Sequence, residues 1–167
     1  YVKKILDARI YDLAVETPVD AAPLLSQRLN NEILLKREDL QPVFSFKLRG
    51  AYNKLRQLSK AQLEAGVIAA SAGNHAQGLA LAAQKMGVKA TILMPITTPK
   101  IKVDAVRGWG ANVVLFGDNY DAAASHANEL IEQHGMTYIH PFDDPDIIAG
   151  QGTVGMEILR QLPGKLD

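Results

Sequence analysis

Short apolar runs alternate with helical patterns along most of the chain, from about Gly66 onward. Each run is nearly continuously apolar, which is typical of strands that helices cover on both faces. The pattern predicts strands at Val67–Ser71, Lys89–Pro95, Asn112–Phe116 and Thr137–His140. Strands that alternate with helices form strand-helix-strand units, so the predicted fold class is α/β, with an open parallel sheet flanked by helices.

The helices predicted between these strands have recognisable ends. They run from Asn74 to Gly87, from Thr98 to Gly108 and from Tyr120 to His134. Asn74 and Thr98 are the expected N-caps, because their short polar side chains accept hydrogen bonds from the free N–H groups of a first turn. Gly87 and Gly135 are expected to end their helices in the left-handed conformation.

Further elements flank this repeat. We predict a strand at Glu32–Lys36, a helix at Lys47–Leu58 with Ser45 as its cap, and a helical segment from Asp144-Pro145 to about Gln161. The last segment contains Gly150–Gly155, which matches the dinucleotide-binding spacing G-x-G-x-x-G but does not follow a strand. We therefore reject a nicotinamide site there and expect a loop start or a close backbone approach.

Composition narrows the functional classes. The chain is 47% hydrophobic and 22% charged, which is typical of a soluble globular protein. Eighteen basic residues balance eighteen acidic ones, so the basic face that nucleic-acid binding requires is not expected. The absence of cysteine excludes disulfides and thiolate chemistry. No apolar run approaches the ~20 residues that span a bilayer, and we expect a cytoplasmic protein without a membrane partner.

The segment Ser71–His75 runs from a strand end into a helix start. In open α/β sheets, ligands bind outside the carboxyl ends of the strands. Free N–H groups at a helix start attract a carboxylate or a phosphate. We therefore expect chemistry first at Ser71–His75, although a simple helix cap would explain the same residues.

Lys47 lies in the first turn of its predicted helix, where a cation opposes the helix dipole. Most such lysines are solvated surface charges. Alternatively, desolvation or a neighbouring cation lowers the pKa of a lysine and frees its amine for Schiff-base chemistry. Arg49 is either such a neighbour or a surface residue.

A metal site has only one suggestive grouping, His140 with Asp143 or Asp144. Aspartate and proline strongly favour turns and helix starts. We interpret His140–Pro145 as a turn followed by a helix cap, and we predict no metal.

Three motifs, in the same order, carry a family resemblance. They are Lys36–Asp39 with Ser45–Ala51, then Ala70–Gly78, then Ala149–Thr153. Together they resemble the biosynthetic threonine dehydratases (threonine ammonia-lyases), which are pyridoxal-phosphate enzymes of the tryptophan-synthase-β-like fold (fold type II). The resemblance covers nearly the whole chain.

The resemblance implies a set of site residues. Lys47 would hold pyridoxal 5'-phosphate as a Schiff base, Phe46 would pack beside the cofactor ring, and Asn74 would bond the ring hydroxyl. The substrate carboxylate would lie against Ser71, Ala72, Gly73, Asn74 and His75. Serine racemases are similar but carry a second serine at the position of Ala72, and a methyl group transfers no proton.

The resemblance also implies an activity, a lyase that converts L-threonine, and L-serine, to the 2-oxo acid and ammonia. For threonine the product is 2-oxobutanoate, in the first step of isoleucine biosynthesis. The expected partner is a small amino-acid substrate, and the complete enzyme is expected to be a homo-oligomer.

The implied organisation is an unfinished two-domain enzyme. Residues 1–46 would begin the large domain, 47–143 would form the small cofactor domain, and 144–167 would return to the large one. The family's glycine-rich phosphate loop would follow Asp167, and Lys165–Asp167 would lead toward the strand before it. We therefore expect this piece alone to be inactive.

Two other interpretations stay open at this stage. The chain is a non-catalytic α/β interaction module, or it belongs to another β-eliminating lyase or a serine racemase of the same fold. Cofactor uptake at Lys47 would support an enzyme, whereas a folded chain without uptake would support the interaction module.

Overall fold

A four-stranded parallel sheet forms the centre of the computed structural model, which describes residues 1–164. Its strands are β3 (Val67–Ala70), β4 (Ala90–Met94), β5 (Asn112–Leu115) and β6 (Thr137–Tyr138), in the order β5-β4-β3-β6. Every neighbouring pair is parallel. The predicted α/β class is confirmed, and each strand is one or two residues shorter than expected because its ends already enter loops.

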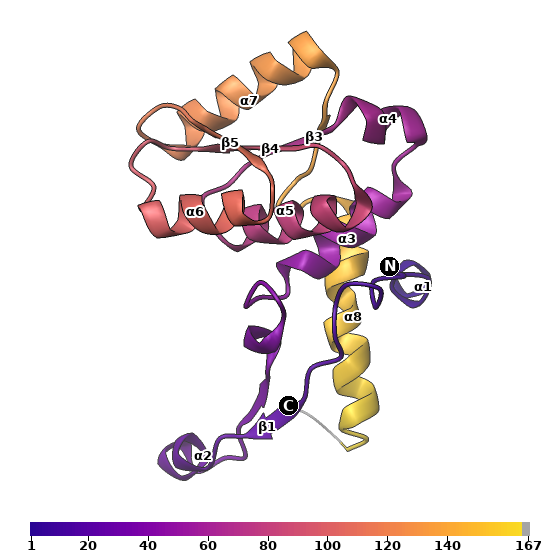
Figure 1. Cartoon of the computed structure of the whole chain (residues 1–167). Coiled ribbons are helices and arrows are strands. Elements are labelled where there is room, and N and C mark those ends of the chain that lie inside the picture. The colour runs from indigo at the N-terminus through magenta and orange to yellow at the C-terminus, as the bar shows by residue number, and fades with distance from the viewer. Residues whose placement is uncertain (165–167) are drawn as a thin grey trace.

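Helices cover both faces of this sheet (Figure 1). On one face lies α7 (Tyr120–His134), and on the other lie α3 (Lys47–Gln57), α5 (Asn74–Met86) and α6 (Lys100–Gly108). Successive residues of β3 lie on alternate faces of the sheet. Val67 and Ala69 belong to the core on the α3 and α5 side, whereas Ile68 packs in the core with Ala123 of α7. The predicted helices are confirmed.

A short helix that the sequence analysis missed precedes β3. It is α4 (Lys60–Ala65), whose first turn has a capping box formed by Ser59 and Gln62. Gly66 ends it with a φ of +91°. The spacing of serine and glutamine three positions apart is a helix-start signal that was present in the sequence.

The N-terminal part forms a separate two-stranded sheet. Strand β1 (Val19–Ala21) pairs antiparallel with β2 (Leu34–Lys36), which lies within the predicted strand Glu32–Lys36. The connection contains α2 (Pro23–Leu29), and a 3₁₀ turn, η1 (Glu38–Leu40), follows β2. The first helix is α1 (Val2–Leu6).

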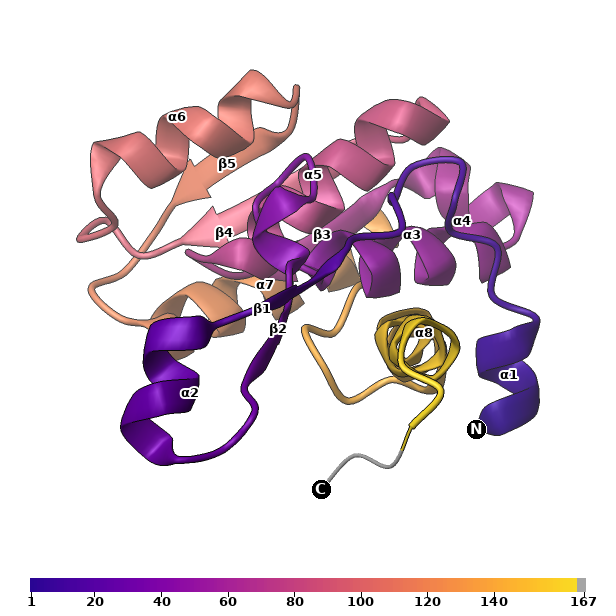
Figure 2. The same cartoon turned by 90° about the horizontal axis from the view of Figure 1, so that it is seen from below.

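The last helix, α8 (Pro145–Gln161), connects these two regions. It extends from α3 toward the two-stranded sheet (Figure 1), and the second view shows it end-on beside α3 and α1 (Figure 2). The three glycines of Gly150–Gly155 lie inside α8, so the expected loop start was wrong. The expected close approach is confirmed, because a Cβ on Gly150 would lie 2.4 Å from the Arg49 carbonyl oxygen.

Three of the expected helix caps were wrong. The N-caps of α3, α5 and α6 are Phe46, Gly73 and Pro99, and none makes a side-chain capping bond. A side-chain cap comes from the residue just before the helix, which is Gly73, whereas Asn74 is already the first helical residue. The hydroxyls of Ser45 and Thr98 are buried without a hydrogen-bond partner among the described residues.

Other helix ends are as predicted. Asp144 caps α8 by accepting hydrogen bonds from the N–H groups of Asp146 and Ile147. Gly87 and Gly135 end α5 and α7 with φ near +68° and +67°. The expected approach to a further strand at Lys165–Asp167 lies outside the described residues. Within residues 1–164, none of the helices has the length and apolarity needed to cross a membrane.

Candidate active site

Lys47 begins α3, and its Nζ donates a hydrogen bond of 2.8 Å to the carbonyl oxygen of Pro141. The side chain is half-buried, and this desolvation lowers the pKa of the Lys47 ammonium. The Phe46 ring centroid lies 5.4 Å from the same Nζ. Burial therefore increases the neutral amine fraction at Lys47, as a nucleophilic lysine requires.

His75 binds the same loop as Lys47 does. Its Nε2 lies 2.9 Å from the carbonyl oxygen of Ile139, two residues before Pro141. A carbonyl only accepts, so Nε2 carries the proton and Nδ1 is an acceptor. Burial lowers the pKa of His75 to about 4, and the nearby Lys47 charge adds to this effect. The residues after β6 therefore bring Lys47 and His75 together.

A close approach of α5 to α3 completes this arrangement. A Cβ on Gly78 would lie 2.8 Å from the Leu48 nitrogen and 2.9 Å from the Lys47 carbonyl carbon. Only glycine permits this separation of the two helices. The start of α5, with Asn74 exposed at its first position, lies beside the start of α3.

The loop Ser71–His75 leaves the carboxyl end of β3 and has space beside it. The Gly73 N–H donates to the Ser71 hydroxyl at 3.3 Å, and a Cβ on Gly73 would meet no atom of the described residues within 4 Å. Strand β3 lies between β4 and β6, so the chain leaves it toward one side and returns on the other. Ligands of open α/β sheets bind at such a switch point.

Burial alone, and no neighbouring cation, lowers the pKa of Lys47, and Arg49 is 0% exposed, so both interpretations of Arg49 were wrong. Its guanidinium is fully buried and donates to both oxygens of Glu38 at 2.7 and 2.8 Å. It also donates to both oxygens of Glu157 at 2.6 and 3.0 Å. A fork of five donors suits two carboxylates, which is why the charge is stable inside the protein.

Glu157 was missed by the sequence analysis. Burial opposes its ionisation, but hydrogen bonds from Arg49, Lys36 and Tyr11 outweigh burial and hold the pKa of Glu157 below its usual value. It lies 108 positions from Arg49, and no spacing in the sequence connects them. Helices α3 and α8 are thus joined by charge as well as by packing.

The His140–Pro145 segment is the predicted turn and helix cap. His140 Nδ1 accepts hydrogen bonds from the N–H groups of Phe142 and Asp143 at 3.2 and 2.7 Å. This closed turn presents the Pro141 carbonyl to Lys47. In the part of the chain that the structure describes, no three histidine, aspartate or glutamate side chains converge on a possible metal position.

Comparison with known proteins identifies the family. The family model described as "Pyridoxal-phosphate dependent enzyme" matches residues 10–167. The chain belongs to this family. It is 60% identical, over 99% of its own length, to the biosynthetic chloroplastic threonine dehydratase of Arabidopsis thaliana, of which it spans 28%.

Solved structures agree with this family. The processed threonine deaminase isoform 2 of Solanum lycopersicum is 57% identical, with a TM-score of 0.93 over 97% of this chain and 45% of that one. Maize serine racemase has the same TM-score at 32% identity, over 97% of this chain and 50% of that one. The chain thus spans half or less of these relatives, and its fold is that of pyridoxal-phosphate enzymes.

The residues around Lys47 fit pyridoxal phosphate. Two buried polar atoms near it, Ser45 Oγ and His75 Nδ1, lack a partner among the described residues. Buried polar atoms are normally hydrogen-bonded, so both mark positions for a polar group. The desolvated amine is the nucleophile that an aldehyde needs, and the exposed Phe46 ring and the open side of Gly73 are compatible with an aromatic ring beside it.

Proposed function

We propose that this chain supplies the reactive lysine and the substrate loop of a pyridoxal-phosphate lyase that dehydrates and deaminates L-threonine and L-serine. The observation that carries the proposal is the Lys47 amine, whose burial lowers its pKa beside the start of α5. The 60% identity to a biosynthetic threonine dehydratase supports threonine as the substrate and isoleucine biosynthesis as the context.

Three residues would hold the cofactor. Lys47 would bond it covalently, Phe46 would pack against its ring, and Asn74 would bond the ring hydroxyl from the first position of α5. When bound, pyridoxal phosphate supplies an electron sink that stabilises negative charge at the substrate α-carbon. The N–H groups in the first turn of α5 remain free for the substrate carboxylate.

The proposed roles of the other residues follow from their chemistry. Ser71, Ala72, Gly73, Asn74 and His75 would surround the carboxylate. The Lys47 amine, once free, would remove the α-proton, the β-hydroxyl would leave as water, and hydrolysis would release ammonia and 2-oxobutanoate. Pro141 offers this amine an acceptor in place of water, because its carbonyl lies 2.8 Å from Nζ.

Ala72 distinguishes the lyase from the second candidate, a serine racemase. The 32% identity to maize serine racemase is the observation that supports racemisation as a second candidate activity. Racemisation requires a proton donor on each face of the α-carbon, and the Ala72 methyl group is no acid or base. We therefore propose elimination without racemisation. Two alternatives to the proposal are a non-catalytic interaction module and another β-eliminating lyase. Evidence for either of them would contradict it.

The remaining expectations are part of the same proposal. Residues 47–143 would form the small cofactor domain, with 1–46 and 144–167 contributing to the large domain. A homo-oligomer is proposed as the assembly of the complete protein, and light scattering of that protein tests it. A cytoplasmic location is proposed and tested by fractionation, since relatives carry both chloroplastic and mitochondrial names.

A chimera tests the activity directly. The matching 166 residues of the Arabidopsis thaliana enzyme are replaced by this chain, and 2-oxobutanoate release from threonine is measured. We expect activity in the chimera, none with Lys47→Ala, and none of the D-isomer from L-serine. A soluble chimera that is inactive toward threonine, or that keeps its activity with Lys47→Ala, would contradict the proposal.

A second experiment tests the cofactor residue in the chain itself. The chain is mixed with pyridoxal phosphate and reduced with borohydride, and peptide mapping locates the label. We expect the label on Lys47. A label spread evenly over exposed lysines would support the non-catalytic module.

A further inference from the structure

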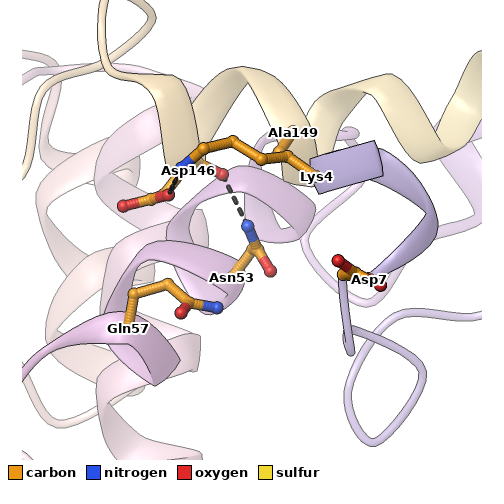
Figure 3. A pocket seen from close by; sticks show the side chains of 6 residues that line it. All are labelled: Lys4, Asp7, Asn53, Gln57, Asp146 and Ala149. Carbon is orange, nitrogen blue, oxygen red and sulfur yellow. Dashed lines mark hydrogen bonds and ion pairs between the residues drawn. The ribbon is translucent and has the colours of Figure 1, made fainter. Parts of the chain in front are cut away.

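A cavity of about 150 Å³ lies away from Lys47, between α1, α3 and α8 (Figure 3). Its wall has polar and charged side chains from all three elements, and the buried Ala149 of α8 completes the lining. The lining residues are Lys4, Asp7, Asn53, Gln57, Asp146 and Ala149. The roles proposed above for the Lys47 site use none of them.

Asn53 is the fixed acceptor of this cavity. The residue is 3% exposed, and its Nδ2 donates to the Asp146 carbonyl oxygen at 2.7 Å. This bond fixes the amide so that Oδ1 faces away from Asp146, toward the side where Asp7 lies (Figure 3). Oδ1 is buried and has no hydrogen-bond partner in residues 1–164. Buried polar atoms are normally hydrogen-bonded, so this oxygen marks a position for a donor that the described residues do not supply.

The charges around the cavity favour a cationic donor. Lys4 is held by one oxygen of Asp146 at 2.8 Å, and Lys54 contacts the other oxygen of Asp146 and the carboxylate of Asp144. Asp7 is the second carboxylate of the lining, and no ion pair of it is found among the described residues. The charged side chains of the lining are thus the Asp7 and Asp146 carboxylates and the Lys4 ammonium group, and since Asp146 pairs with Lys4, the Asp7 charge is left uncompensated in the lining.

We propose that this cavity binds a small primary ammonium ion, which donates N–H bonds to Asn53 Oδ1 and to the Asp7 carboxylate. The volume accommodates an aliphatic amine of a few carbons rather than an isolated water molecule. Binding joins α1 to α3 and α8. The proposal is independent of the activity proposed for Lys47.

The test uses the chain labelled with ¹⁵N and methylammonium chloride as the probe, at constant ionic strength. The side-chain amide signals of Asn53 are followed during the titration. We expect a saturable shift with a dissociation constant on the order of 10 mM, since a ligand of two non-hydrogen atoms binds weakly. Tetramethylammonium has the same charge but no N–H donor, and we expect no such shift with it.

Variants separate the site from general charge effects. Asp7→Asn removes the unpaired charge and is expected to weaken methylammonium binding about fivefold. Asp12→Asn is the matched control, because Asp12 is an exposed carboxylate near the same end of the chain that pairs with Arg56 outside the cavity. Its binding should equal that of the unmodified chain.

Asn53→Leu removes the side-chain amide signals, so this variant is followed at the backbone amide of Ala149. We expect no shift on titration with methylammonium. A thermal unfolding curve shows whether this variant folds, and if it does not, Asp7→Asn decides. No saturable shift, an equal shift with tetramethylammonium, or unchanged binding by Asp7→Asn would overturn the proposal.

Discussion

The Nζ of Lys47 is joined to the carbonyl oxygen of Pro141 by a hydrogen bond of 2.8 Å, although 94 positions separate the two residues. The acceptor is presented by a turn that His140 closes from inside. A single neutral carbonyl thus replaces part of the water around a half-buried amine. The amine is therefore directed to one place and is less protonated than an exposed lysine.

This placement predicts a selective reactivity. At mildly alkaline pH, pyridoxal phosphate with borohydride should label Lys47 several times faster than Lys60, whose side chain is 91% exposed. The reason is the larger neutral fraction of the buried amine. Quantitative peptide mapping measures both rates in one sample, and equal rates would show that burial does not activate Lys47.

His75 predicts a pH dependence of stability. Its pKa is about 4 in the folded chain against 6.5 as the ordinary value, so between these values the unfolded chain binds a proton that the folded chain does not. Its contribution to the free energy of unfolding should therefore fall by up to about 1.4 kcal/mol per pH unit as the pH decreases from about 6.5 to 4.

Urea unfolding at several pH values measures this slope. His75→Gln keeps a side-chain donor for the Ile139 carbonyl but does not titrate, and it should show a smaller slope. An unchanged slope in this variant would assign the acid sensitivity to other groups, such as Glu157.

The buried arginine predicts a large loss of stability. Arg49→Met leaves Glu38 and Glu157 facing each other without their shared cation, and we expect a loss of about 3–5 kcal/mol. Arg56→Met is the control, because the Arg56–Asp12 pair is exposed and should contribute less than about 1 kcal/mol. Chemical unfolding of both variants gives the comparison, and similar losses would contradict the importance of burial.

Two glycines of α8 predict opposite effects of the same substitution. Gly150→Ala would place a methyl group 2.4 Å from the Arg49 carbonyl oxygen and 2.8 Å from the Asn53 Cβ, so we expect a loss of about 1–3 kcal/mol. Gly155→Ala meets no atom within 4 Å in residues 1–164 and should stabilise the helix by about 0.5–1 kcal/mol. Thermal unfolding of the pair decides, and equal changes would refute the close crossing.

Hydrophobic periodicity was sufficient to predict the parallel sheet and its main helices. Val67–Ala70 is fully buried, and such a strand has to be apolar at every position, so a local pattern identifies it. The helix ends were less predictable. Asn74 is a good cap by type, but the turn after β3 starts the helix one residue earlier than a cap at Asn74 requires.

The buried charges could not be predicted for a different reason. Arg49 is stable inside the protein only because Glu38 and Glu157 come to it from 11 and 108 positions away. A local pattern assigns such a residue to the surface. Likewise, the link between Lys47 and His75 through residues 139–141 arises from the return of the chain after α7, which no single motif contains.

The glycine contacts at Gly78 and Gly150 join three helices through their main chains rather than through side chains. A side chain can change rotamer to absorb a displacement, but a main-chain contact cannot. Helices α3, α5 and α8 should therefore move together as one rigid body. Within residues 1–164, any opening or closing around a bound ligand then has to come from the loops and from the Lys47 side chain, while the main chain at Lys47 stays in place.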